Sequence, residues 1–273
     1  MPLNEKAEQQ EADSVEELEE ALPSTSAAIH ELIRRDGEKE MNRGVIALLL
    51  SAIAGGMTMS TSMIARGILI AHLPETDFGF LFEAIGYTVG FILVIVAKQQ
   101  LFTENTLTPV LPFMSAPSIV NLGKLLRIWG TVFLGNMIGG AIAVWFITTM
   151  PVFDKETTDA FLKIGTTMME NTAMQMFAKG IVSGWLIATM VWMLHRVEHS
   201  QLMIILLVTY VIAIGDFTHI IVGSVEAMYL YVHGMASLSD VLFRFGVPTL
   251  LGNMVGGTLI FGLMSHAQVK LDE

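Results

Sequence analysis

Long apolar runs fill most of this sequence and restrict its fold more than any other feature. A helix needs roughly 20 apolar residues to cross a bilayer core, and six runs approach or exceed that length: 45–71, 81–100, 122–149, 172–195, 201–216 and 240–265. Two shorter apolar segments, 107–115 and 220–232, follow polar breaks and cannot cross alone. Charged residues make up 15% of the chain, against about 25% in an average soluble domain. The sequence therefore predicts an all-α polytopic membrane protein whose second and fifth transmembrane helices are broken.

The two ends of the chain differ from this apolar part. Residues 1–25 are acidic and poor in aromatic residues, which predicts a disordered tail that does not bind nucleic acid. This tail lacks the basic and apolar stretches of a signal peptide. Residues 26–43 place Ile29, Leu32 and Ile33 on one helical face, which predicts an amphipathic interfacial helix. Residues 44–268 form the predicted transmembrane domain, and residues 269–273 form the C-terminal end.

Basic residues predict the orientation of the chain. The predicted cytoplasmic ends carry most of them: Arg34, Arg35, Lys39, Arg43, Lys124, Arg127, Arg196 and Lys270. By the positive-inside rule, both termini should lie in the cytoplasm. Arg66, near the outer end of the first span, is an exception, and we expect it to extend toward the outer surface.

A heptapeptide occurs twice, which indicates an internal repeat. "LGNMIGG" begins at Leu134 and contains Gly135 and Asn136, and "LGNMVGG" begins at Leu251 and contains Gly252 and Asn253. The same interval places the polar break of the fifth span on that of the second. Three crossings followed by three crossings would run in opposite directions, as in inverted-repeat transporters. The alternative is convergence on small-residue helix packing.

The paired breaks are the candidate substrate path. The first break, within "KQQLFTENTLTPVLPFMS", contains Pro109 and Pro112, and the second contains Asp216, His219 and Gly223. Irregular backbone at membrane depth is tolerated only where protein buries it or where it lines a wet cavity. Interruptions at corresponding positions of two halves therefore favour a path, although kinks that serve packing alone are the alternative.

Charged residues within these apolar regions need a partner, a proton or water. A charge at the bilayer centre costs roughly 2.5–3.5 kcal/mol. Lys98 is expected to be buried beside a carboxylate of one of the breaks (Glu104, Asp216 or Glu226), and the alternative is an interfacial lysine. Glu104 and Glu226 would either hold the broken helices together or relay protons. Lys179 is expected to pack against a loop or a neighbouring subunit.

Known catalytic and metal-binding patterns are missing from the sequence. It contains no HExxH, P-loop or nucleophile-elbow motif and no cysteine, so neither an enzyme nor a cofactor is predicted. The nineteen methionines are expected to fill contacts between helices.

Several segments together resemble the formate/nitrite transporter family. "LFTENTLTPVLPF", "WGTVFLGNMIGG", "GIVSGWLIATMVW" and "VPTLLGNMVGG" are similar to its second, third, fourth and sixth helices. "AKQQLFTENT" and "GDFTHIIVGSVE" resemble a divergent, YfdC-like branch of inner membrane proteins. The resemblance implies an aquaporin-like fold and a homopentamer in the bacterial inner membrane. It implies transport of small monovalent anions such as formate or nitrite, with Phe102 at a constriction and Thr103 facing the permeant.

The sequence departs from this family at two places. The family has a pore histidine in its fifth-helix loop, and either His219 or, by the alignment without a gap that we prefer, Gly223 occupies that position. Gly184 stands where the fourth helix of the family has asparagine. The alternatives to an anion transporter are therefore a channel for a small neutral solute and a membrane protein with a structural role.

Overall fold

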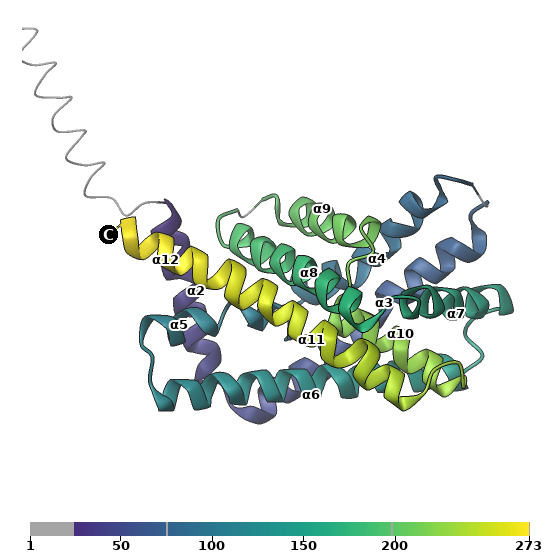
Figure 1. Ribbon diagram of the computed structural model, residues 1–273, viewed down its shortest axis with the longest axis horizontal. Helices are drawn as coiled ribbons and strands as arrows, with labels where there is room; N and C mark the ends of the chain where they lie inside the picture. Colours follow the sequence, from purple (N-terminus) through teal and green to yellow (C-terminus); the bar gives the residue numbers. More distant parts are fainter. Residues whose placement is uncertain (1–24, 75, 198, 273) are drawn as a thin grey trace, which may run out of the picture.

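The computed structural model describes residues 25–74, 76–197 and 199–272, and these residues form a bundle of helices (Figure 1). The tail predicted over residues 1–25 lies outside the described residues except for Thr25. In chain order the first elements are α2 (Thr25–Met41), α3 (Val45–His72), α4 (Gly79–Val96), the 3-10 turn η1 (Glu104–Thr106), α5 (Val110–Ser115), α6 (Ile119–Thr149) and α7 (Lys155–Met169). Next come α8 (Ala173–Leu194), α9 (Gln201–Ile214) and α10 (Ile220–Val232). A continuous rod ends the chain: η2 (Asp240–Gly246), α11 (Val247–Met254), η3 (Val255–Gly262) and α12 (Leu263–Asp272).

Five segments of the described chain are long and apolar enough to cross a membrane: α3, α4, α6, α8 and the C-terminal rod. The sequence predicted another crossing over residues 201–216, but α9 has only 14 residues. At about 1.5 Å per residue it spans about 21 Å, less than a hydrocarbon core of about 30 Å. The chain resumes as α10, a 13-residue apolar helix, beyond the polar break.

α7 is a helix that the sequence analysis treated as an outer loop. Its hydroxyl and acidic residues hid an amphipathic pattern, in which Phe161, Ile164 and Met168 are buried. Asp154 begins the helix by accepting a hydrogen bond from the backbone N–H of Thr157 at 2.8 Å. The side chain of Thr157 first, and then this backbone bond, lower the pKa of the Asp154 carboxyl.

Glycines allow two pairs of helices to approach backbone to backbone. A Cβ on Gly56 of α3 would collide with the backbone of Asn136 in α6, and a Cβ on Gly184 of α8 would collide with that of Asn253 in α11. Small residues at such crossings are typical of membrane helices. The polar side chain that the family resemblance led us to expect at position 184 therefore has no room there.

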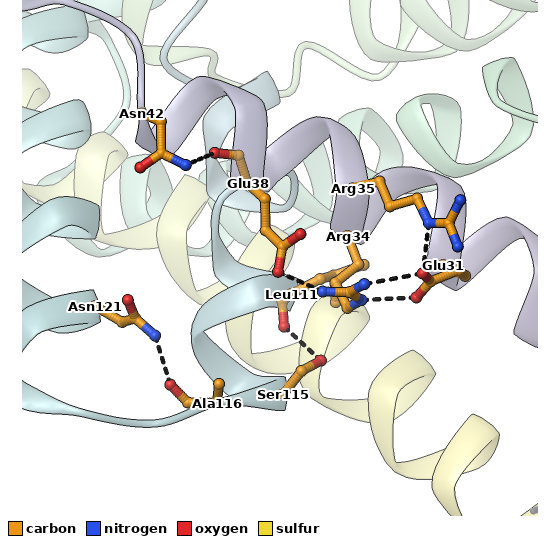
Figure 2. A network of polar contacts seen from close by, with 9 residues as sticks. All are labelled: Glu31, Arg34, Arg35, Glu38, Asn42, Leu111, Ser115, Ala116 and Asn121. Atoms are coloured by element: carbon orange, nitrogen blue, oxygen red, sulfur yellow. Dashed lines mark hydrogen bonds and ion pairs between the residues drawn. The ribbon is translucent and has the colours of Figure 1, made fainter.

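α2, α5 and α12 lie at one end of the bundle and α7 lies toward the other, so the described chain begins and ends on the same side (Figure 1). α2 buries Ile29 and Ile33 against the bundle, while Leu32 is 50% exposed. On its exposed side, Glu31 accepts hydrogen bonds from Arg34 and Arg35 (Figure 2). These bonds, led by that from Arg34, lower the pKa of Glu31 to about 2.

Candidate functional site

The first break follows α4 and is held from outside by one asparagine. Lys98 turns the chain with a positive φ of 51°. The backbone N–H of Phe102 donates to the Oδ1 atom of Asn136 at 2.9 Å. The Nδ2 atom of Asn136 donates to the carbonyls of Gln100 at 2.9 Å and Ala52 at 2.8 Å. One buried side chain thus satisfies backbone groups that the interrupted helix leaves open.

The second break has the same construction. Asp216 also has a φ of 51°, and the N–H of Ile220 donates to the Oδ1 atom of Asn253 at 2.9 Å. The Nδ2 atom of Asn253 donates to the carbonyls of Thr218 at 3.1 Å and Gly180 at 2.9 Å. Asn136 and Asn253 are both fully buried, and each follows a glycine of the heptapeptide, Gly135 or Gly252.

The two breaks meet at a hydrogen bond between Thr103 and His219. The Oγ1 and Nε2 atoms lie 2.7 Å apart, and both side chains are buried. The Nδ1 atom of His219 accepts a hydrogen bond from the N–H of Val222 at 3.4 Å and caps α10. Because Nδ1 is an acceptor, the proton of the neutral ring lies on Nε2, which donates to Thr103. The ring of Phe91 packs edge-on against the imidazole, with centroids 4.9 Å apart.

A cavity lies on each side of this contact. A narrow cavity of about 30 Å³ is lined by Arg66, Tyr87, Asp216, His219, Gly223 and Glu226, among others. A wider cavity of about 400 Å³ is lined by Asp36, Lys39, Glu40, Lys98, Gln100 and Glu104, among others. α9 lines the wide cavity with Gln201 at its beginning and the narrow cavity with Ile212 near its end. The cavities therefore lie toward opposite ends of the bundle, with the contact between Thr103 and His219 located between them.

The wide cavity is bordered by α2, whose polar side faces it. Lys39 donates a hydrogen bond to Asp36 at 2.7 Å, and this contact lowers the pKa of Asp36. The Nε2 atom of His195 lies 3.5 Å from the same carboxylate. Glu40 accepts a hydrogen bond from Gln100 at 2.9 Å, which connects α2 to the first break.

The prediction that Lys98 is buried in an ion pair is wrong. Its side chain is exposed and lines the wide cavity, at a left-handed turn just beyond the end of α4. Asp216, one of its expected partners, instead forms an ion pair with Lys179 of α8. Lys179 therefore packs against a loop, as predicted, and this loop is the second break.

The other predicted residues are distributed around the two breaks. Phe102 is buried against Trp129 and Phe133 of α6. Glu104 is half-buried and lines the wide cavity, whereas Glu226 is buried and lines the narrow one. Gly223 lies one turn beyond His219, where a Cβ would meet the ring of Phe245.

Sequence reasoning missed Phe91 and Tyr87 of α4, which reach the site from the middle of an apolar run. Nothing in the run itself distinguishes them, and only the four-residue spacing places both on one helical face. The part of the chain that the structure describes has no cluster of three histidine or acidic side chains suited to a metal ion.

Comparison with known proteins identifies the family. The sequence model described as formate/nitrite transporter matches residues 27–267. The chain belongs to the formate/nitrite transporter family. This confirms the resemblance inferred from the broken-helix motifs, and the family is one of membrane transport proteins.

Relatives within the formate/nitrite transporter family support this membership. The inner membrane protein YfdC of Escherichia coli strain K12 is 52% identical over 268 residues, which cover 98% of this chain and 86% of that protein. The formate channel FocA of Haemophilus influenzae is 24% identical over 67% of this chain and 72% of its own length. The branch predicted from "AKQQLFTENT" and "GDFTHIIVGSVE" is therefore confirmed.

Solved structures of the formate/nitrite transporter family share the fold. A pentameric formate channel with formate bound superposes with a TM-score of 0.69 at 19% identity, over 83% of this chain and 98% of that one. A second structure, an FNT family ion channel, gives a TM-score of 0.70 at 18% identity, over 89% of this chain and 96% of that one. At these identities the similarity shows the fold alone.

Proposed function

We propose that this protein is a bacterial inner-membrane channel or secondary transporter for a small monovalent anion, such as formate or nitrite, or for its conjugate acid. Each subunit of a homopentamer would carry its own path, which runs from the narrow cavity, past Thr103 and His219, to the wide cavity. Both termini would lie in the cytoplasm. The wide cavity would then open inward, because α2 borders it and carries Arg34, Arg35, Lys39 and nearby Arg43.

The aquaporin-like architecture proposed for the path is a three-plus-three inverted repeat. The first half would comprise α3, the broken pair α4–α5, and α6. The second half would comprise α8, the broken pair α9–α10, and the C-terminal rod. Its support is the matched pair of asparagines, each of which donates to two carbonyls and accepts from one N–H of a broken helix. Small-residue convergence alone would not require the same three bonds in both halves.

The observation that carries the proposal is the Thr103–His219 hydrogen bond, buried between cavities at opposite ends of the bundle. A hydroxyl and a ring N–H there can donate to a passing anion oxygen once their mutual bond opens. The N-terminal end of α10, which His219 caps, adds a positive dipole. Formate channels among the relatives make formate the first anion to test.

These contacts favour conduction by hydrogen-bond donation over proton transfer from His219. To donate a proton and end as a neutral ring, His219 would first have to carry a second proton, on Nδ1. That atom accepts the N–H of Val222, so protonation would break the helix cap. We therefore place His219 at the pore centre, where the gapless alignment had favoured Gly223, and assign it the role of a neutral donor.

Labelled formate uptake into proteoliposomes tests the proposal. Thr103→Val keeps the shape of the side chain and removes the hydroxyl, and it should lower formate flux at least tenfold. Thr149→Val is the matched control, because this exposed threonine bonds only its own helix at the carbonyl of Trp145. Uptake no faster than in protein-free vesicles would refute anion transport.

The same vesicles distinguish the alternatives. Formamide flux without formate flux would favour a neutral-solute channel, and no flux of either would favour a structural role. Between pH 5 and 8, formate flux corrected for protein-free vesicles should change little. A steep rise toward low pH that His219→Phe abolishes would contradict the neutral-donor role of His219.

A further inference from the structure

The narrow cavity contains three polar side chains whose hydrogen-bonding capacity is unused. Arg66 of α3 is half-buried, and Tyr87 of α4 and Glu226 of α10 are 6% and 5% exposed. Within the described chain, none of these three side chains has a hydrogen-bond or ion-pair partner. None of their side-chain polar atoms is completely buried without a hydrogen-bond partner. The three groups therefore remain accessible from the cavity that they line. Their unused donors and acceptors can form hydrogen bonds with water or a ligand in that cavity.

The helix packing fixes these side chains in place. A Cβ on Gly86, directly before Tyr87, would lie 2.5 Å from the backbone nitrogen of Arg66, so α3 and α4 touch at this level. The hydroxyl of Ser62 donates to the carbonyl of Tyr87 at 2.7 Å and joins the same two helices.

Nearby charges leave Arg66 available for a ligand. Asp216, one carboxylate of this cavity, already forms an ion pair with Lys179. Glu226 is the remaining carboxylate of this cavity, and it does not approach Arg66 within ion-pair distance. The cavity thus holds a guanidinium, a phenol and a carboxyl group around a space of about 30 Å³. Such a space has room for about two water molecules, which is close to the size of an anion of three heavy atoms.

The proposed repeat indicates that this cluster is not a requirement of the fold. Arg66 lies ten residues after Gly56, and its counterpart ten residues after Gly184 is Leu194. Glu226 lies ten residues after Asp216, and its counterpart ten residues after Lys98 is Thr108. Leu194 and Thr108 both line the wide cavity. The same structural positions are therefore filled by uncharged side chains in the other half.

We propose that Arg66, Tyr87 and Glu226 form a binding site for a small planar oxyanion at the narrow entrance, with Arg66 as the residue that determines specificity. The inference rests on the proposed transport function and deepens it by naming the entry site. A guanidinium presents a planar fork that matches two oxygens on one carbon or nitrogen, whereas a lysine ammonium is a point charge. The site should thus prefer formate and nitrite to chloride, and the tyrosine hydroxyl can donate a further hydrogen bond. An ionised Glu226 repels an anion in the same cavity, so removing its charge should strengthen anion binding.

Anion binding to the purified full chain in detergent tests the site without relying on transport. The readout is the shift of the melting temperature with sodium formate, nitrite or chloride, titrated at constant ionic strength. Wild-type protein should bind formate and nitrite at least tenfold more tightly than chloride. Arg66→Lys should retain the charge and bring this ratio close to one, and Glu226→Gln should tighten formate binding several-fold.

Lys163→Met is the matched control, because Lys163 is an exposed cation near the same end of the bundle and lines a different cavity. Its anion preference should equal that of wild type. An unchanged formate preference in Arg66→Lys, or an equal loss in Lys163→Met, would overturn the proposal. Glu226→Gln keeps the test decisive if Arg66→Lys does not fold, because unchanged or weaker formate binding in this variant would also overturn it.

Flux measurements then separate the two proposals. Selective formate binding without formate flux would refute the transport function and leave the site supported. If formate and chloride cross at equal rates in both wild type and Arg66→Lys, the binding site would be refuted and the transport function would remain supported.

Discussion

Replacing Asn253 by leucine should destabilise the protein strongly, because this side chain holds the second break. The substitution keeps a similar volume and removes three hydrogen bonds, to the N–H of Ile220 and to the carbonyls of Thr218 and Gly180. Asn253 is fully buried, so water cannot readily replace the lost partners.

The expected magnitude follows from the number of bonds. Hydrogen bonds between membrane helices average about 0.6 kcal/mol, and a buried group left unsatisfied costs about 1–3 kcal/mol. Three bonds at about 0.6–3 kcal/mol each give a loss of about 2–9 kcal/mol. For a chain of this size, 1 kcal/mol shifts Tm by roughly 2–4 °C, so Tm should fall by at least about 4 °C.

Thermal unfolding in detergent, followed by circular dichroism, measures this effect. Asn136→Leu should cause a loss of similar size, because Asn136 makes the same set of bonds to the first break. Asn121→Leu is the control, because the half-buried side chain of Asn121 bonds only the nearby carbonyl of Ala116 (Figure 2). If Asn253→Leu melts within 1 °C of wild type, the asparagine does not hold the break and the reasoning fails.

Three further predictions concern packing, pH and assembly. Gly184→Ala should cost about 1–3 kcal/mol by overpacking against Asn253, whereas Gly123→Ala, where a Cβ would meet nothing within 4 Å, should leave Tm unchanged or raise it. Burial first, and then the charge of neighbouring His266, lower the pKa of His30 from 6.5. The neutral form is therefore favoured in the folded state, and its stabilisation should be complete above about pH 6.5 and decline below it. His30→Phe should flatten this part of a Tm–pH profile. An unchanged slope would show that His30 does not cause the pH dependence of stability. Native mass spectrometry in lipid-preserving detergent should give five subunits, and monomers or dimers alone would contradict the pentamer.

The sequence drew attention to two places where polar side chains interrupt apolar runs. Charged and amide side chains do not readily continue a membrane helix, and this pattern pointed to Lys98 and Asp216, where the backbone turns with a positive φ. The lengths of the helices were less accessible. α9 ends at Ile214, two residues before the end of the predicted run, and the backbone turns with a positive φ at Asp216. The amphipathic α7 was missed because its apolar face meets helices that are distant in sequence.

The environment of single charges was predictable only in part. Lys98 and Asp216 share one backbone conformation, yet only Asp216 has an ion-pair partner, because Lys179 comes from a different helix. No local pattern specifies that pairing. Arg66 was noticed as an exception to the positive-inside rule, but its position beside Tyr87 depends on the crossing of α3 and α4 at Gly86.

The proposed symmetry of the two halves explains which residues sequence reasoning could find. A residue that both halves need, such as Asn136 and Asn253, occurs twice in a similar context, so the repeat reveals it. A residue that makes one cavity different from the other occurs once, as do Arg66 and Glu226, whose counterparts are Leu194 and Thr108. Directional selectivity requires the two cavities to differ, since identical entrances would bind the same anion equally at both ends. The residues that differ between the two halves are therefore the ones to examine for substrate choice. Substitutions of Arg66 or Glu226 are expected to leave the helices and the two asparagines in place.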